Sequence, residues 1–136
     1  MPPRSLHVAL GYLPLLVGCA AIFAVSSMSQ PPIPAALLFE NSDKVLHAIA
    51  YCALAVLALV GAQARRGALS RGASLEATLI AFLYGVSDEL HQGFVPGRSS
   101  SVADLAADVA GGALGAYVVG VMLLRAWGRR AARQPS

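Results

Sequence analysis

The chain has 136 residues, of which 57% are hydrophobic and only 12% are charged, with a formal net charge of +3. Soluble domains usually carry about 25% charged residues, so this composition excludes an ordinary soluble domain and indicates a membrane protein. Basic residues do not alternate with aromatic ones, which excludes nucleic acid as a partner. Cys19 and Cys52 lie inside apolar runs and form neither a disulfide framework nor a C-x-x-C metal motif.

The first apolar segment, residues 6–28, predicts a membrane helix. No charged residue lies between Arg4 and Glu40, and a membrane helix tolerates the kink expected at Pro14. A cleaved signal peptide and a lipobox at residues 16–19 are the alternatives. The segment stays apolar well beyond residue 19 and is longer than the apolar region of a signal peptide, so we expect the helix to be retained.

A proline-rich stretch over residues 29–34 ends this helix in a loop. Residues 41–43, Asn-Ser-Asp, supply N-cap side chains for a second helix over about 43–63. A basic loop with arginines at positions 65, 66 and 71 follows it.

The third helix is predicted over about 75–94, with Ser74 as its N-cap. Its apolar part, residues 77–86, is too short to cross a bilayer. The helix therefore spans only if the charged residues of 87–94 also enter the membrane.

Residues 95–98, Val-Pro-Gly-Arg, have proline and glycine in the order that a type II turn prefers. Ser101 and Asp104 then form a capping-box-like start to a fourth helix over about 104–124. A basic tail, residues 125–136, ends the chain.

These elements predict an all-α fold, a single membrane domain over residues 1–136 that forms a four-helix transmembrane bundle. Basic residues in short loops mark the cytoplasmic side. The N-terminus, the 65–71 loop and the C-terminal tail fall on one side with eight basic residues, whereas the other side has Arg98, with Lys44 at its border. Both termini are therefore expected in the cytoplasm.

Polar residues recur at four-residue spacing on the last three helices, which places each set on one helix face. The second helix carries Asp43, His47 and Tyr51 on one face, and the third helix carries Asp88 and Gln92, with Glu89 about 100° round the helix from Asp88. The fourth helix carries Asp104 and Asp108. We expect them to form a polar pocket in the outer half of the bilayer. The candidate pocket residues are Asp43, Lys44, His47, Tyr51, Asp88, Glu89, Gln92, Arg98, Asp104 and Asp108.

Acids in this region need a partner from elsewhere in the fold. A carboxylate at the centre of a lone membrane helix costs roughly 2.5–3.5 kcal/mol, and the macrodipole disfavours Asp88 and Glu89 near a helix C-terminus. A nearby cation, a proton or a water-filled pocket could stabilise them. Structural interpretations stay open: Asp43 and Asp104 as capping residues, Tyr51 in the core, His47 in a buried pair, and the acids in a hydrogen-bond network.

The spacing of the acids and histidines does not match the H-E-x-x-H zinc pattern. Asp104 and Asp108 together with Asp88 or Glu89 could form an oxygen-rich site for a hard cation, but the pattern is weak. We therefore assign no metal and no cofactor from the sequence. Gly111 and Gly115 form a G-x-x-x-G motif, which lets another helix approach the fourth helix closely.

Two blocks of residues resemble the VanZ-like family of small membrane proteins. The first is Asp43-Lys44-x-x-His47-x-x-x-Tyr51, and the second is Asp88-Glu89-x-x-Gln92-x-Phe94-x-Pro96-Gly97-Arg98 with Asp104, Gly111 and Gly115. Asp108 departs from the pattern, in which asparagine usually stands at that position. The resemblance implies an outward-facing polar site and a link to teicoplanin resistance, with which the family's namesake is associated.

We therefore expect a multi-pass protein of the bacterial inner membrane that contacts the lipid bilayer. Its polar pocket would bind or act on an envelope component, such as an anionic precursor or a lipid headgroup engaged by Arg98. One alternative is a membrane-embedded hydrolase or transferase acting on a lipid-linked precursor, and another is a small proton-coupled transporter. A homo-oligomer is compatible with each.

The predicted topology can be tested with a reporter fused after Arg133. We expect a fusion in the C-terminal tail to report a cytoplasmic location, because the basic residues of the tail disfavour export. Paired phosphatase and fluorescent-protein fusions provide the measurement. Phosphatase activity from this fusion would contradict the four-helix topology.

Overall fold

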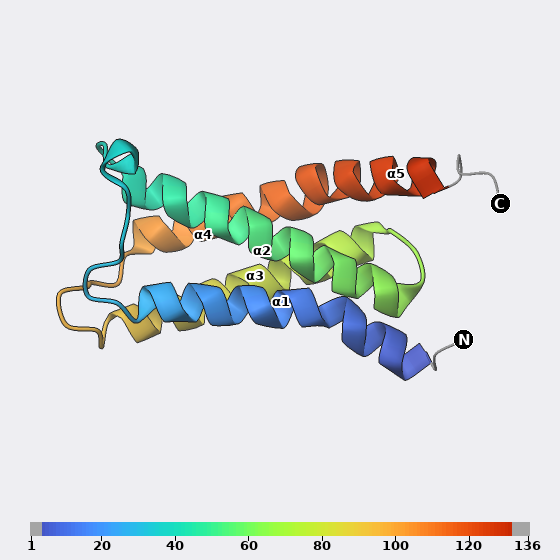
Figure 1. Cartoon of the computed structure of the whole chain (residues 1–136), viewed down its shortest axis with the longest axis horizontal. Helices are drawn as coiled ribbons and strands as arrows, with labels where there is room; N and C mark the ends of the chain where they lie inside the picture. Colours follow the sequence, from blue (N-terminus) through green and yellow to red (C-terminus); the bar gives the residue numbers. More distant parts are fainter. Residues whose placement is uncertain (1–3, 132–136) are drawn as a thin grey trace.

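The computed structural model describes residues 4–131, and every regular element within them is helical, which confirms the all-α prediction. The elements in chain order are α1 (Arg4–Ser26), a short 3-10 helix η1 (Ala35–Leu37), α2 (Ser42–Arg66), α3 (Arg71–Gln92), α4 (Val102–Leu114), a π-helical segment η2 (Gly115–Val119) and α5 (Gly120–Ala131). Because α4, η2 and α5 run without interruption, the described chain has four long helices (Figure 1).

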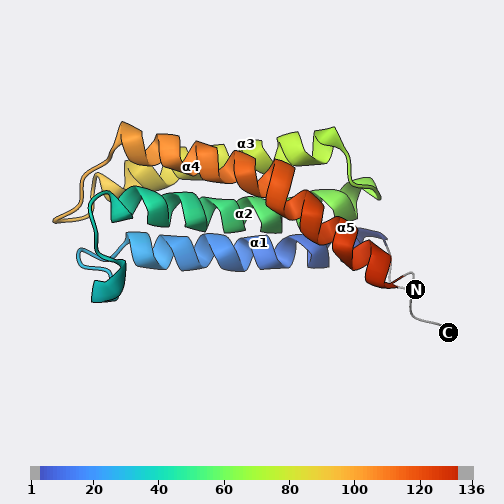
Figure 2. The same cartoon turned by 90° about the horizontal axis from the view of Figure 1, so that it is seen from above.

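The four long helices lie side by side, and their connections divide the molecule into two ends (Figures 1 and 2). The α2–α3 loop, the start of α1 and the end of α5 lie together at what we call the arginine end (Figure 1). The α1–α2 connection, with η1, and the α3–α4 loop lie at the opposite end, which we call the acidic end. The sequence analysis placed the 65–71 loop on one side of the membrane and the other two connections on the opposite side. The two ends of the molecule divide the connections in the same way.

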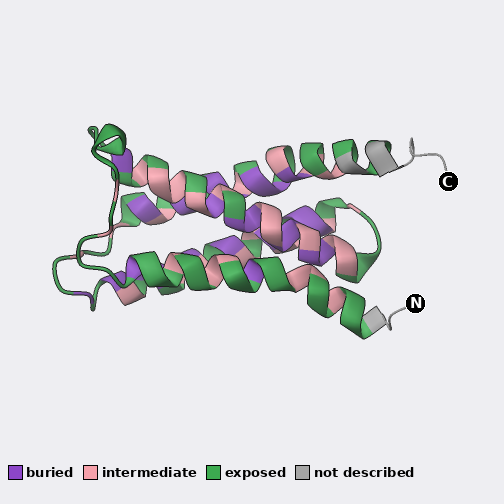
Figure 3. Ribbon diagram, viewed as in Figure 1, coloured by how far each residue is buried: buried purple, intermediate pink, exposed green. Residues whose placement is uncertain are grey.

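Three stretches are long and apolar enough to cross a membrane: Ser5–Ser26, Ser42–Arg66 and Val102–Ala126. Within the first stretch only Leu15 and Ser26 are buried, so most of its large apolar residues are exposed (Figure 3). Leu16 and Val17, for example, are each 63% exposed. Contiguous apolar surface of this kind is unfavourable in water and indicates contact with a lipid bilayer.

The closest helix packing joins α4 and η2 to α2. A Cβ atom added at Gly111 would lie 2.1 Å from the carbonyl oxygen of Ala48, and one added at Gly115 would lie 2.2 Å from that of Cys52. Any residue larger than glycine would therefore force the two backbones apart. The G-x-x-x-G motif thus has α2 as its partner helix, as small residues allow in membrane bundles.

The helix starts differ from the sequence predictions at two of three positions. Ser70, not Ser74, is the N-cap of α3, and its hydroxyl accepts a hydrogen bond from the Ala73 N–H at 3.1 Å. The α2 helix begins after Asn41, which adopts a left-handed conformation and makes no side-chain cap bond. Ser101 caps α4 as expected, because its hydroxyl accepts from the Asp104 N–H at 3.2 Å.

The loop over residues 95–98 forms the predicted turn. Gly97 has a φ of +80°, as the third position of a type II turn requires. The Arg98 N–H donates to the carbonyl oxygen of Val95 at 3.0 Å, which closes the turn.

Glu76 joins three helices at the arginine end. Its carboxylate accepts from the Tyr12 hydroxyl at 2.7 Å on α1, from Arg66 Nε at 3.0 Å on α2, and from the guanidinium of Arg65. These partners lie 10 to 64 residues away in the sequence, so they leave no local pattern from which the contact could be predicted.

The glycine contact predicts a sharp difference between two Gly→Ala substitutions. Gly111→Ala should lower stability by about 1–3 kcal/mol, because overpacking a helix contact costs that much. Gly128→Ala is the matched control, since a Cβ atom there meets nothing within 4 Å. The measurement is the thermal unfolding of both purified variants in detergent. Equal Tm values would contradict the close approach of α4 to α2.

Candidate functional site

The acidic end is organised around a buried pair between α2 and α4. His47 Nδ1 lies 2.9 Å from Asp108 Oδ1, and the Asp108 side chain is fully buried. Gly85 on α3 provides room for this pair, because a Cβ atom there would lie 3.1 Å from Asp108 Oδ2. The second oxygen of Asp108 has no hydrogen-bond partner within the described residues.

Glu89 reaches the same place from α3. Its Oε1 lies 3.9 Å from His47 Nδ1, and its Oε2 accepts a hydrogen bond of 2.7 Å from the backbone N–H of Ser101. The side chain is 8% exposed, and Oε1 has no hydrogen-bond partner in the described chain. Glu89 therefore attaches the start of α4 to α3 and leaves one oxygen facing His47.

Asp104 contributes the third carboxylate to this group. Its backbone N–H is held by Ser101, but its side chain lies 3.4 Å from the Lys44 ammonium rather than capping the helix in return. Lys44 also pairs with Asp43 at 2.8 Å. Asp43 is 56% exposed at the rim, so it is outside the buried group.

A second chain of polar contacts runs alongside. Gln92 Nε2 donates to Asp88 Oδ2 at 3.1 Å, and Arg98 Nη2 donates to Gln92 Oε1 at 2.7 Å. Asp88 and Gln92 are buried, whereas Arg98 is partly exposed. Gln92 therefore orients the guanidinium of Arg98 without neutralising it.

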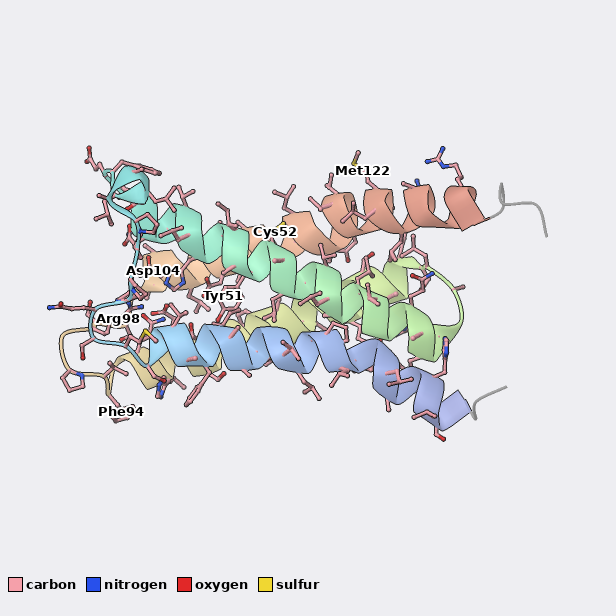
Figure 4. The ribbon with its side chains drawn as sticks, in the orientation of Figure 1. Tyr51, Cys52, Phe94, Arg98, Asp104 and Met122 are labelled. Carbon is pink, nitrogen blue, oxygen red and sulfur yellow. The ribbon has the colours of Figure 1, made fainter. Side chains whose placement is uncertain are left out.

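Tyr51 lies below these groups, deeper between the helices than Arg98 and Asp104 (Figure 4). It is 1% exposed, and its ring stacks parallel to that of His47 with centroids 6.4 Å apart. Its hydroxyl has no hydrogen-bond partner among residues 4–131 with described side chains. Tyr51 thus has the core position that sequence analysis left open, and its ring lies beside that of His47.

His91 is separate from this site. Its Nε2 lies 3.0 Å from the Ser27 hydroxyl, and its ring lies 4.7 Å from that of Phe23 on α1. It therefore joins α3 to α1 instead of facing α2 and α4.

We define the acid cluster as His47, Glu89, Asp104 and Asp108. One ligand atom from each of His47, Glu89 and Asp104 lies within 4.8 Å of the other two. Two carboxylate charges at 4.8 Å repel each other by about 3 kcal/mol at an effective dielectric constant of about 20. The acid cluster therefore needs positive charge, whether protons or a cation, to remain buried.

Sequence analysis missed two contributors to the site. The Ser101 backbone N–H holds Glu89, and Gly85 makes room for Asp108. No side-chain pattern could reveal a backbone donor. Gly85 lies three residues before Asp88 on the same helix, and this was only a weak sign that another helix packs closely there.

Comparison with known proteins identifies the family. The VanZ/LLP1 family matches residues 10–124. The chain belongs to this family. The matched range of this VanZ/LLP1 member includes α2, α3 and α4, and therefore every residue of the acid cluster. No curated protein and no solved structure matches the chain.

The buried pair predicts how the VanZ/LLP1 member responds to substitution at Asp108. Asp108→Leu should lower stability by about 1–3 kcal/mol, because it leaves the largely buried His47 Nδ1 without its partner. Asp108→Asn keeps an oxygen acceptor of the same shape and should cost markedly less. Thermal unfolding in detergent measures both variants. If the leucine variant is as stable as the asparagine variant, the pair does not support the fold.

Proposed function

We propose that this chain is a multi-pass protein of the bacterial inner membrane, with both termini in the cytoplasm and the acidic end outside. The burial pattern of α3 supports its role as the fourth span. Its polar residues Asp88, Glu89 and Gln92 are buried against the other helices. The exposed large side chains of the same helix are Leu75, Leu79, Phe82, Leu83 and Leu90, which suit a lipid environment.

The outward-facing site would bind an anionic group, a phosphate or a carboxylate, of an envelope lipid or wall precursor. The observation that carries this proposal is the state of Arg98. Its guanidinium is held by the neutral amide of Gln92, and it makes no ion pair with a carboxylate of the described chain. An oriented guanidinium without a counter-ion is well suited to bidentate recognition of an anion.

Binding of a wall precursor would connect this site to glycopeptide drugs. Teicoplanin acts on cell-wall precursors, so a protein that holds such a precursor could alter its availability to the drug. The link to teicoplanin resistance is part of this proposal and depends on the identity of the ligand.

A membrane-embedded hydrolase or transferase is the second candidate function. The His47–Asp108 pair, with Glu89 Oε1 at 3.9 Å from the imidazole, favours it, because such groups can exchange protons with a reacting ligand. A change in the covalent form of a precursor, seen by mass spectrometry with the wild type and absent with Glu89→Gln, would distinguish an enzyme from a binding protein.

Arg98→Gln tests the proposed function. We expect the wild type, purified from bacterial membranes, to retain a phosphate- or carboxylate-bearing envelope lipid, and Arg98→Gln to retain it at least about 10-fold less. A charge-assisted hydrogen bond contributes about 1.5–3 kcal/mol, which corresponds to at least that factor. Mass spectrometry of the co-purified lipids provides the measurement.

Arg71→Gln is the matched control, because it removes the same charge at the exposed start of α3, at the arginine end. Equal retention by the wild type and both variants, at equal protein yield, would show that Arg98 does not recognise the ligand.

A further inference from the structure

The acid cluster has the ligand set of a metal centre. The ligand atoms of His47, Glu89 and Asp104 come from α2, α3 and α4 and lie within 4.8 Å of one another. Ligands on a single ion, with bonds of about 2.0–2.2 Å, lie within about 4.4 Å of one another. Small side-chain rotations would therefore bring the three atoms onto one ion.

A second observation points into the same space. Glu89 is 6% exposed, and its Oε1, the atom facing His47, has no hydrogen-bond partner in the described chain. Asp104 Oδ1 and Asp108 Oδ2 are likewise buried without a hydrogen bond, although Asp104 Oδ1 lies 3.4 Å from Lys44 Nζ. Buried polar atoms are nearly always satisfied, so the unpartnered oxygens of Glu89 and Asp108, beside an Asp104 oxygen that contacts only Lys44, point to a cation as their partner.

We propose that His47, Glu89 and Asp104 bind a divalent first-row metal ion, with Zn²⁺ and Mn²⁺ as the best candidates. One imidazole and two carboxylates suit these ions, whereas Mg²⁺ and Ca²⁺ prefer oxygen ligands alone. Asp108 contacts His47 Nδ1 at 2.9 Å and orients the ring, so it is a positioning residue for an ion that binds the other ring nitrogen, Nε2. This site stands on its own geometry and does not depend on Arg98.

The charged groups near the metal site are Lys44, Arg98 and Asp88, and only Lys44 contacts one of the proposed ligands. Lys44 competes for Asp104 but has a second partner in Asp43 at 2.8 Å, so it stays paired when the metal binds Asp104. Arg98 donates to Gln92 and Asp88 accepts from Gln92, so both belong to the neighbouring polar chain. Removing the charge of Lys44 should therefore tighten metal binding, an effect that a purely structural cluster would not show.

The test uses the full-length protein, purified in detergent with a histidine-free affinity tag and stripped of metal with a chelator. Equilibrium dialysis against ZnCl₂, and separately against MnCl₂, is followed by elemental analysis of the protein. We expect one ion per chain for the wild type. Glu89→Gln and Asp104→Asn should each weaken binding at least about 10-fold, because loss of even an outer-shell partner of a metal ligand costs about 10–100-fold in affinity.

Glu40→Gln is the matched control for Glu89→Gln, because Glu40 lies in the α1–α2 connection and is exposed. It should bind like the wild type, and Lys44→Gln should bind more tightly. Should the ligand variants fail to fold, the wild type and Lys44→Gln still provide the comparison.

Wild-type protein that holds no metal above the background set by a metal-free membrane protein would overturn the proposal. So would unchanged binding in Glu89→Gln and Asp104→Asn, or a lack of tightening in Lys44→Gln. Arg98→Gln separates this proposal from the proposed function, because that variant should lose the envelope ligand and keep the metal.

Discussion

The distance between the backbones of α2 and α4 is the constraint on which the rest of the structure depends. Gly111 and Gly115 allow the two helices to touch at the carbonyl oxygens of Ala48 and Cys52. His47 directly precedes Ala48, and Asp108 lies three residues before Gly111, so the same approach brings His47 to Asp108. Small residues in the middle of the bundle thus set the geometry of polar residues near its end, so packing and site cannot vary independently.

In the proposed four-span topology, the burial of its acidic residues accounts for how α3 could lie within the membrane. Carboxylates facing lipid would oppose insertion, whereas buried carboxylates need only a partner of opposite charge or a hydrogen-bond donor. Glu89 accepts a hydrogen bond from the Ser101 N–H, and Asp88 accepts one from the side-chain amide of Gln92. Burying an acid with an incomplete set of partners lowers stability.

Apolar runs, capping residues and turn signals were sufficient to predict the four long helices. Four-residue spacing correctly paired Asp88 with Gln92, whose side chains form a hydrogen bond. The G-x-x-x-G motif correctly predicted a close neighbour, but it could not identify α2. Local capping rules failed at Ser74, because Ser70 offers an equivalent hydroxyl one turn earlier and α3 extends to it. Asp43 satisfied the spacing rule, yet it lies where α2 emerges at the rim and remains exposed. Ion pairs such as Arg66–Glu76 depend on the meeting of helix ends, which spacing within one helix does not encode.

The bond from the Ser101 backbone to Glu89 has a consequence for mutational studies of this protein. The donor is present in every residue except proline, so an alanine scan would remove the cap hydroxyl of Ser101 and leave its bond to Glu89 untouched. Such a scan would assign position 101 to helix stability alone. Sequence variation at position 101 would not reveal this bond either, because many residue types can occupy the position and keep the backbone N–H. Side-chain substitutions therefore do not report the contribution of the Ser101 N–H to the site. Replacement of that amide by an ester would remove the donor and measure it.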